Sequence, residues 1–218
     1  MKRIFVLLLA LMLTLPLLFA AAQAEVTEET VEEAVEEAVE EAAEGEEAQN
    51  FFADMALTYM DGTPFDTSVF RGKPIFLNIW ATWCNPCVME MPHLDELAAE
   101  YADKINIIGI HAEGMTVSEA GEVVVAEEKN QTALALKEEK GFTYPLLNPD
   151  TTLFVLMNDP QYGLQVSVLP TTWFIDGDGY IRNVLEGYRD KDQWQKEIDD
   201  FLTFLENEPA AEDGQDEG

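Results

Sequence analysis

The stretch Trp83-Cys84-Asn85-Pro86-Cys87 places the two cysteines of the chain three positions apart. An almost wholly apolar run at 75–80 precedes it and is typical of a buried strand, and a helical pattern follows from Cys84 to about residue 102. Pro86 suits the first turn of a helix, where its missing amide proton costs nothing. We therefore expect both cysteines at a strand-to-helix junction, close enough to form a disulfide.

The position of the first cysteine favours thiol chemistry. At a helix N-terminus the unpaired amides and the helix dipole favour negative charge, so the thiolate of Cys84 should be stabilised and reactive. Cys87 lies one turn further into the helix and is expected to be more buried, where it would resolve the mixed disulfide that Cys84 forms. The pattern predicts a redox-active Cys84–Cys87 pair that works without a bound cofactor.

A metal site and a purely structural disulfide are the alternatives. Structural zinc usually takes four protein ligands, and besides the cysteines the chain offers only His93 and His111. On a regular helix His93 projects roughly opposite Cys84. Copper(I) stays open as an alternative because Met89 and Met91 are soft ligands nearby. A structural disulfide that closes so short a loop would add little stability. We predict a redox pair and no metal.

Composition limits the size and the partners of the protein. The 218 residues allow one ordinary domain with extensions. Much of the formal net charge of −31 comes from residues 25–47 and 206–218. Such acidity argues against nucleic acid, whose phosphates recruit Lys and Arg, and against an anionic membrane surface. Two cysteines are too few for a disulfide-stapled secreted scaffold.

The two ends of the chain differ from its middle. Lys2 and Arg3 precede a mostly apolar run from Ile4 to Leu18, and the run 22–24 offers small residues for cleavage. We expect residues 1–24 to be a signal peptide, with an uncleaved membrane anchor as the alternative. Residues 25–50 form an acidic low-complexity linker, read as a solvated spacer or as a helix formed on a basic partner, and 208–218 form an acidic tail. The predicted location is extracytoplasmic, secreted or membrane-anchored.

Residues 51–207 are expected to form one domain. Strands are predicted at 52–60, 75–80, 105–110, 172–175 and 180–186, and helices at 84–102, 118–140, 151–159 and 190–206. The order strand, helix, strand, helix, then a hairpin and a last helix indicates an α/β fold. Its central mixed sheet should be flanked by helices.

Several motifs together resemble the thioredoxin superfamily, and more narrowly its exported TlpA/ResA-like thiol–disulfide oxidoreductases. The run Leu77-Asn78-Ile79-Trp80-Ala81-Thr82-Trp83-Cys84-Asn85-Pro86-Cys87 is similar to that family's active-site strand and helix start. Pro92 matches the proline that kinks this helix, and Val168-Leu169-Pro170-Thr171-Thr172 resembles the cis-proline segment. The resemblance covers roughly residues 51–206 and implies a thioredoxin-like fold.

The resemblance also implies substrates and a substrate surface. The backbone of Leu169, before a cis Pro170, would pair with an incoming peptide like an added strand, and Trp83 and Pro86 complete the expected substrate contacts. The implied partners are thiols and disulfides of exported proteins and a membrane electron donor, and we expect a monomer. A disulfide oxidase or isomerase is the alternative. Peroxide reduction is less favoured, because the threonine-rich setting of a peroxidatic cysteine is absent.

Asn78 departs from the pattern of thioredoxins, which carry a buried acid at this position. Asparagine cannot exchange a proton with the second cysteine. Some exported relatives place a glutamate after the next strand, which makes Glu113 the candidate proton acceptor for Cys87. A solvated loop glutamate is the alternative reading of Glu113.

Overall fold

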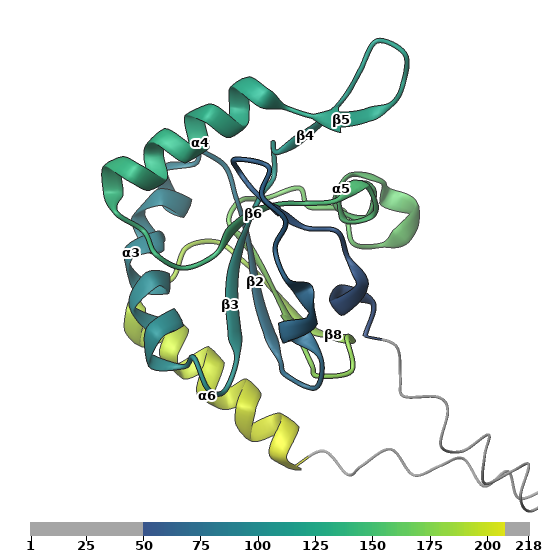
Figure 1. Cartoon of the computed structure of the whole chain (residues 1–218). Helices are drawn as coiled ribbons and strands as arrows, with labels where there is room; N and C mark the ends of the chain where they lie inside the picture. The colour runs from purple at the N-terminus through teal and green to yellow at the C-terminus, as the bar shows by residue number, and fades with distance from the viewer. Residues whose placement is uncertain (1–49, 208–218) are drawn as a thin grey trace, which may run out of the picture. The chain divides into compact units, whose positions relative to one another are not determined.

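A six-stranded mixed sheet forms the centre of the part of the chain that the computed structural model describes, residues 50–207 (Figure 1). Its strand order is β1-β6-β3-β2-β7-β8. The central strand β2 (Ile75–Trp80) runs parallel to β3 (Asn106–His111) and antiparallel to β7 (Thr171–Ile175). Both β2 and β7 are buried along their whole length, as expected for strands covered on both faces. The predicted α/β class and thioredoxin-like fold are confirmed.

The outer strands are shorter or more exposed. β6 (Leu146–Asn148) pairs in parallel with β3, and β1 (Thr58–Tyr59) pairs antiparallel with β6. β8 (Ile181–Glu186) pairs antiparallel with β7 after a turn and closes the other edge. The strand predicted at 52–60 was wrong for most of its length, because β1 has only a short partner and the segment before it forms a 3-10 helix, η1 (Phe51–Asp54).

Helices cover the two faces of the sheet unequally (Figure 1). α3 (Asn85–Glu100), α4 (Glu127–Lys140) and α6 (Lys191–Asn207) contribute to one apolar core with the side chains that β2 and β7 point to that face. The second core lies on the opposite face, under η1, η2 (Thr67–Phe70) and α5 (Thr151–Asn158). A third 3-10 helix, η3 (Pro160–Tyr162), follows α5. Within residues 50–207, no helix combines the length and the apolar character needed to cross a membrane.

The helix predicted at 118–140 is correct only in its second half. Before α4 the chain forms a hairpin of β4 (Met115–Val117) and β5 (Val123–Val125), with a turn that includes Gly121 at φ 81°. The β-branched valines favour a strand, whereas the polar residues between them resemble a helix surface. α4 ends where predicted, at Gly141, whose φ of 73° suits a residue without a side chain.

Asn50 fixes the start of the described domain. Its side-chain oxygen accepts hydrogen bonds from the backbone N–H groups of Phe52 and Ala53, and its amide donates to Phe70 O at 3.1 Å and Gly177 O at 2.9 Å. These bonds tie the entry of the chain to the sheet. The predicted signal peptide, all of the predicted acidic linker except Asn50, and the acidic tail lie outside the described residues.

Candidate active site

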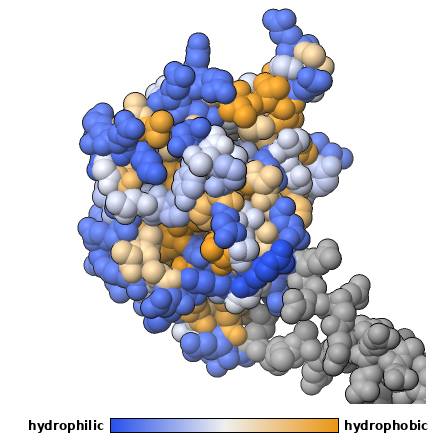
Figure 2. Space-filling model, in the orientation of Figure 1, coloured by the Kyte–Doolittle hydropathy of each residue, from blue (hydrophilic) through white to orange (hydrophobic). Residues whose placement is uncertain are grey.

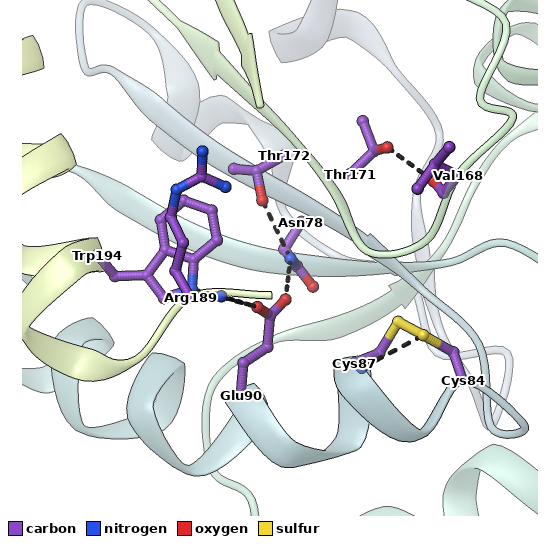
Figure 3. Close-up of a disulfide and its surroundings, with 9 residues drawn as sticks. All are labelled: Asn78, Cys84, Cys87, Glu90, Val168, Thr171, Thr172, Arg189 and Trp194. Carbon is purple, nitrogen blue, oxygen red and sulfur yellow. Dashed lines mark hydrogen bonds between the residues drawn. A yellow bond between two sulfur atoms is a disulfide. The ribbon is translucent and has the colours of Figure 1, made fainter. Parts of the chain in front are cut away.

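The two cysteines lie where β2 leads into α3, joined by a disulfide with a Cα–Cα distance of 5.3 Å (Figure 3). Cys84 is the N-cap residue of α3, and its Sγ accepts the backbone N–H of Cys87 at 3.2 Å. Cys84 keeps 4% of its surface exposed and Cys87 none. The Cys84 sulfur therefore lies at the positive end of the helix dipole, next to unpaired backbone N–H groups. Cys87 lies inside the first turn and is buried.

Apolar side chains border the disulfide. Trp83 is 64% exposed and Val168 is 44% exposed, so both could contact a substrate. Pro86 is exposed in the first turn of α3. Leu169 packs against the apolar core that includes both cysteines, and the Leu169–Pro170 peptide bond is cis. The structure thus brings together the cysteines and the four residues predicted to contact substrate.

Glu90 is a buried acid that sequence reasoning missed. Its side chain is fully buried on α3, three positions after Cys87 and therefore on the same side of the helix. Its Oε1 accepts a hydrogen bond from Asn78 Nδ2 at 2.8 Å. Its Oε2 accepts from the backbone N–H of Arg189 and from Trp194 Nε1, both at 3.3 Å (Figure 3).

Burial gives this carboxyl group an unusual affinity for protons. It raises the pKa of Glu90 from 4.5 to about 7, although the hydrogen bonds from Asn78, Arg189 and Trp194 and the charge of Arg189 act in the opposite direction. The Arg189 guanidinium lies 4.9 Å from the centre of the Trp194 ring. An acid that is about half ionised at neutral pH can both take up and release a proton there.

Asn78 orients the acid. Its Nδ2 donates to Thr172 Oγ1 at 3.1 Å as well as to Glu90, and its Oδ1 has no hydrogen-bond partner among the described residues. Rotating the amide by half a turn would direct that oxygen toward Glu90, where it could accept a hydrogen bond from the protonated, neutral carboxyl group. Asn78 can therefore serve both protonation states of Glu90.

Glu113 lies in a different environment from the one that its predicted role requires. It follows β3 in a loop, is partly exposed, and its Oε1 accepts a hydrogen bond from Lys129 Nζ at 2.7 Å. Among residues 50–207, the carboxylate of Glu113 thus contacts Lys129 and not Cys87. The geometry favours Glu90 as the proton acceptor in its place.

The histidines do not join the cysteines in a metal site. His111 is buried at the end of β3, where its Nδ1 lies 3.1 Å from Asn130 Oδ1, and burial lowers its pKa. No group of three or more His, Cys, Asp and Glu residues within 50–207 is arranged to hold a metal ion. That the protein needs no cofactor stays a prediction, supported by the presence of the disulfide.

The fold and the site together define a thioredoxin-like thiol–disulfide oxidoreductase: a Cys-x-x-Cys disulfide at a helix N-terminus, packed near a cis-proline loop of a mixed sheet. The family model described as "AhpC/TSA family" matches residues 45–184, and the chain belongs to this family.

Named relatives make the class more specific. The chain is 30% identical over 149 residues to "Thiol-disulfide oxidoreductase ResA" of Geobacillus kaustophilus, an alignment that covers 67% of this chain and 73% of the relative. It is 28% identical over 156 residues to "Thioredoxin-like protein YneN" of Bacillus subtilis, covering 72% of this chain and 79% of that protein. The predicted family and enzyme class are confirmed.

Solved structures support the fold. A thioredoxin-family thiol:disulfide interchange protein from Chlorobium tepidum aligns with a TM-score of 0.50 and 22% identity, over 66% of this chain and 90% of that chain. A DsbF homologue from Corynebacterium diphtheriae aligns with a TM-score of 0.51 and 21% identity, over 71% and 89% of the two chains.

Proposed function

We propose that this oxidoreductase reduces disulfides of exported client proteins, with Cys84 as the nucleophile, Cys87 as the resolving thiol and Glu90 as the proton acceptor of Cys87. The observation that carries the proposal is the unequal setting of the two cysteines. Cys84 lies at the helix N-terminus beside exposed apolar side chains, whereas Cys87 is enclosed one turn from a buried acid.

The reaction follows from this arrangement in two exchange steps. The Cys84 thiolate attacks one sulfur of the client disulfide, a Cys84–client disulfide forms, and the other client sulfur leaves as a thiolate that takes up a proton. Ionised Glu90 then accepts the proton of the Cys87 thiol, and the Cys87 sulfur attacks Cys84 Sγ. The Cys84–Cys87 disulfide forms, and the second client sulfur leaves as a thiolate that takes up the proton held by Glu90. The client has then gained two electrons and two protons, and Glu90 is ionised again.

The substrate would lie over the edge of the site. Trp83 and Pro86 offer exposed surface next to the cysteines in the chain, and Leu169, before cis Pro170, packs against the core that includes both cysteines. The backbone of Leu169 would pair with an extended client segment, since a peptide in that position can add to the loop like a strand.

Electrostatics favours the reducing direction. The ionised fraction of Glu90, one turn from Cys87, disfavours a thiolate at Cys87. A less stable dithiolate makes the disulfide form comparatively favourable, which lowers the reduction potential and makes a better electron donor. The signal-like sequence 1–24 supports export. A membrane electron donor would then return the pair to the dithiol.

A trapping experiment tests the roles of the two cysteines. Cys87→Ser should accumulate a mixed disulfide between Cys84 and client proteins, because the second step is blocked. Cys84→Ser is the matched control and should accumulate none. If the Cys87→Ser protein forms no adduct while Cys84 is still accessible to alkylation, the resolving role of Cys87 is wrong.

The direction is tested by equilibrating the Cys84–Cys87 pair with a defined thiol buffer. We expect a reduction potential of about −270 mV or lower, that of a reductant. A value of about −120 to −180 mV would make the protein an oxidant or isomerase and reverse the proposed direction.

A further inference from the structure

The β4–β5 hairpin carries apolar side chains away from the core. Val117 is 57% exposed and Val125 is 48% exposed, and Val124 is also exposed. Figure 2 shows a hydrophobic patch where the hairpin of Figure 1 meets the domain. Valine is favoured in strands that pack against a neighbour, so these exposed valines need a reason beyond the stability of the hairpin itself.

A groove of about 710 Å³ lies between this hairpin, the start of α4 and α5. All three residues of β4 line it, together with Val125 of β5 and Phe154 of α5. Consecutive side chains of a strand point to opposite faces, so one face of β4 alone could not bring all three residues to the groove. The groove therefore lies along the edge of β4.

That edge has free backbone groups. The N–H of Ala126 donates to Gly114 O, and the N–H of Ser118 donates to Glu122 O, so alternate residues of this strand face β5. By the alternation of an antiparallel ladder, the backbone groups of Met115 and Val117 point to the opposite side, toward the open edge. Within residues 50–207, β4 pairs with no strand other than β5. An extended peptide could add there.

The acidic lining of the groove favours a basic occupant. Glu113, Glu127 and Glu128 line it against the single ammonium group of Lys129, which already pairs with Glu113. The Oε2 of Glu113 has no hydrogen-bond partner among the described residues. A segment with Lys or Arg would complement these carboxylates, whereas a second copy of this acidic hairpin would bring like charges together.

The groove lies at the end of the sheet that carries the cysteines. Trp80 and His111 are paired as the last residues of the parallel strands β2 and β3, and the chain reaches Cys84 and Met115 four residues after each of them. Four residues span at most about 14 Å. On the other side of the groove, α5 contacts the loop before Pro170, since the N–H of Val166 donates to Met157 O. The groove therefore lies at the same end of the sheet as the proposed substrate surface.

We propose that this groove binds an extended segment of the client polypeptide, rich in β-branched apolar residues and carrying Lys or Arg, which adds as a strand to the free edge of β4. The inference rests on the proposed function, because it assumes that the client is a protein with a disulfide. Binding at β4 would hold the client while Cys84 attacks.

The test uses three synthetic peptides that share one disulfide loop and the full chain in its dithiol form. The first peptide has no extension, the second is extended by alternating Val and Lys, and the third by alternating Val and Glu. We expect the second-order rate constant of disulfide reduction to be about tenfold higher for the Val–Lys peptide than for the unextended one. The Val–Glu peptide should gain nothing, and added salt should reduce the gain of the Val–Lys peptide.

Two matched proline variants locate the binding edge. Val117→Pro removes an outward N–H on the groove side, and Val123→Pro makes the same change at its cross-strand partner on the far side of the hairpin. Val117→Pro should lose the gain of the Val–Lys peptide and Val123→Pro should keep it. Equal rates with the unextended peptide show that the active site of each variant is intact. Should Val117→Pro not fold, Glu127→Gln combined with Glu128→Gln should abolish the preference for Lys over Glu.

The outcomes separate the two proposals. If the unextended peptide is reduced but the Val–Lys extension adds nothing, the groove proposal is overturned and the proposed function stands. An equal loss in both proline variants also overturns it. The groove proposal is also overturned if sedimentation shows that the protein is a dimer and only Val117→Pro dissociates it. A second copy of the chain would then occupy the edge of β4. If no peptide disulfide is reduced, the proposed function itself fails.

Discussion

Glu90 should make the stability of the oxidised protein fall as the pH rises. Its pKa is raised by burial from 4.5 to about 7, whereas in the unfolded chain it ionises near the ordinary value. Between these values the native state keeps a proton that the unfolded state has lost. The stabilising contribution is complete below about pH 4.5 and is lost as the pH rises through about 7. The difference of about 2.5 pH units corresponds to roughly 3 kcal/mol.

Urea denaturation of the oxidised protein between about pH 4 and pH 8, compared with Glu90→Gln, measures this contribution. The cysteines do not titrate in the disulfide form. The pKa of His111 is lowered by burial, so its contribution rises with pH, but it is common to both proteins and cancels in their difference. We expect the wild-type protein to lose roughly 3 kcal/mol more than Glu90→Gln over this range. Parallel curves for the two proteins would refute the argument that Glu90 is protonated in the folded state at mildly acidic pH.

Three further changes probe the packing and the site. Gly109→Ala would place a Cβ 2.6 Å from Leu146 Cδ2, so we expect a loss of about 1 to 3 kcal/mol in chemical denaturation. Asn50→Ala removes the cap of η1 and the amide that donates to two backbone carbonyls, and should cost about 2 to 3 kcal/mol by the same measurement. Trp194→Phe removes a donor to Glu90 Oε2 and should raise the pKa of Glu90 further, as followed by carbon-13 NMR of its carboxyl group; an unchanged or lower pKa would contradict this contact.

Local patterns were enough to predict the elements that position the cysteines. The apolar run of β2 and the proline in the first turn of α3 lie within a few residues of the cysteines, so each signal acts locally. The β4–β5 hairpin was missed because the polar residues of its turn suit a helix, and the preference of its few valines for a strand is weak when no partner is visible in the sequence.

Glu90, the acid near Cys87, was missed for a different reason. The donors that hold Glu90 come from β2, from the segment before α6 and from α6 itself, so only the folded chain brings them together. One signal was available in the sequence. Glu90 falls on the same helical stripe as Cys87, Met91 and Leu94, where a charged residue is rare unless it has a role. In the sequence, the asparagine at position 78 favoured a more distant acid, Glu113, instead.

The bond from Trp194 to Glu90 spans 104 residues and links the acid to the last helix of the domain. As the chain is synthesised, the cysteines appear before α6, and the contact that α6 makes with Glu90 is missing until this helix docks. Until then the carboxyl group is open to water and keeps an ordinary acidity, because the burial that raises its pKa has not yet occurred. The environment that raises the pKa of Glu90 is therefore completed only with the last helix. In the proposed function, an unfinished chain would carry both thiols without the acid proposed to accept the proton of Cys87.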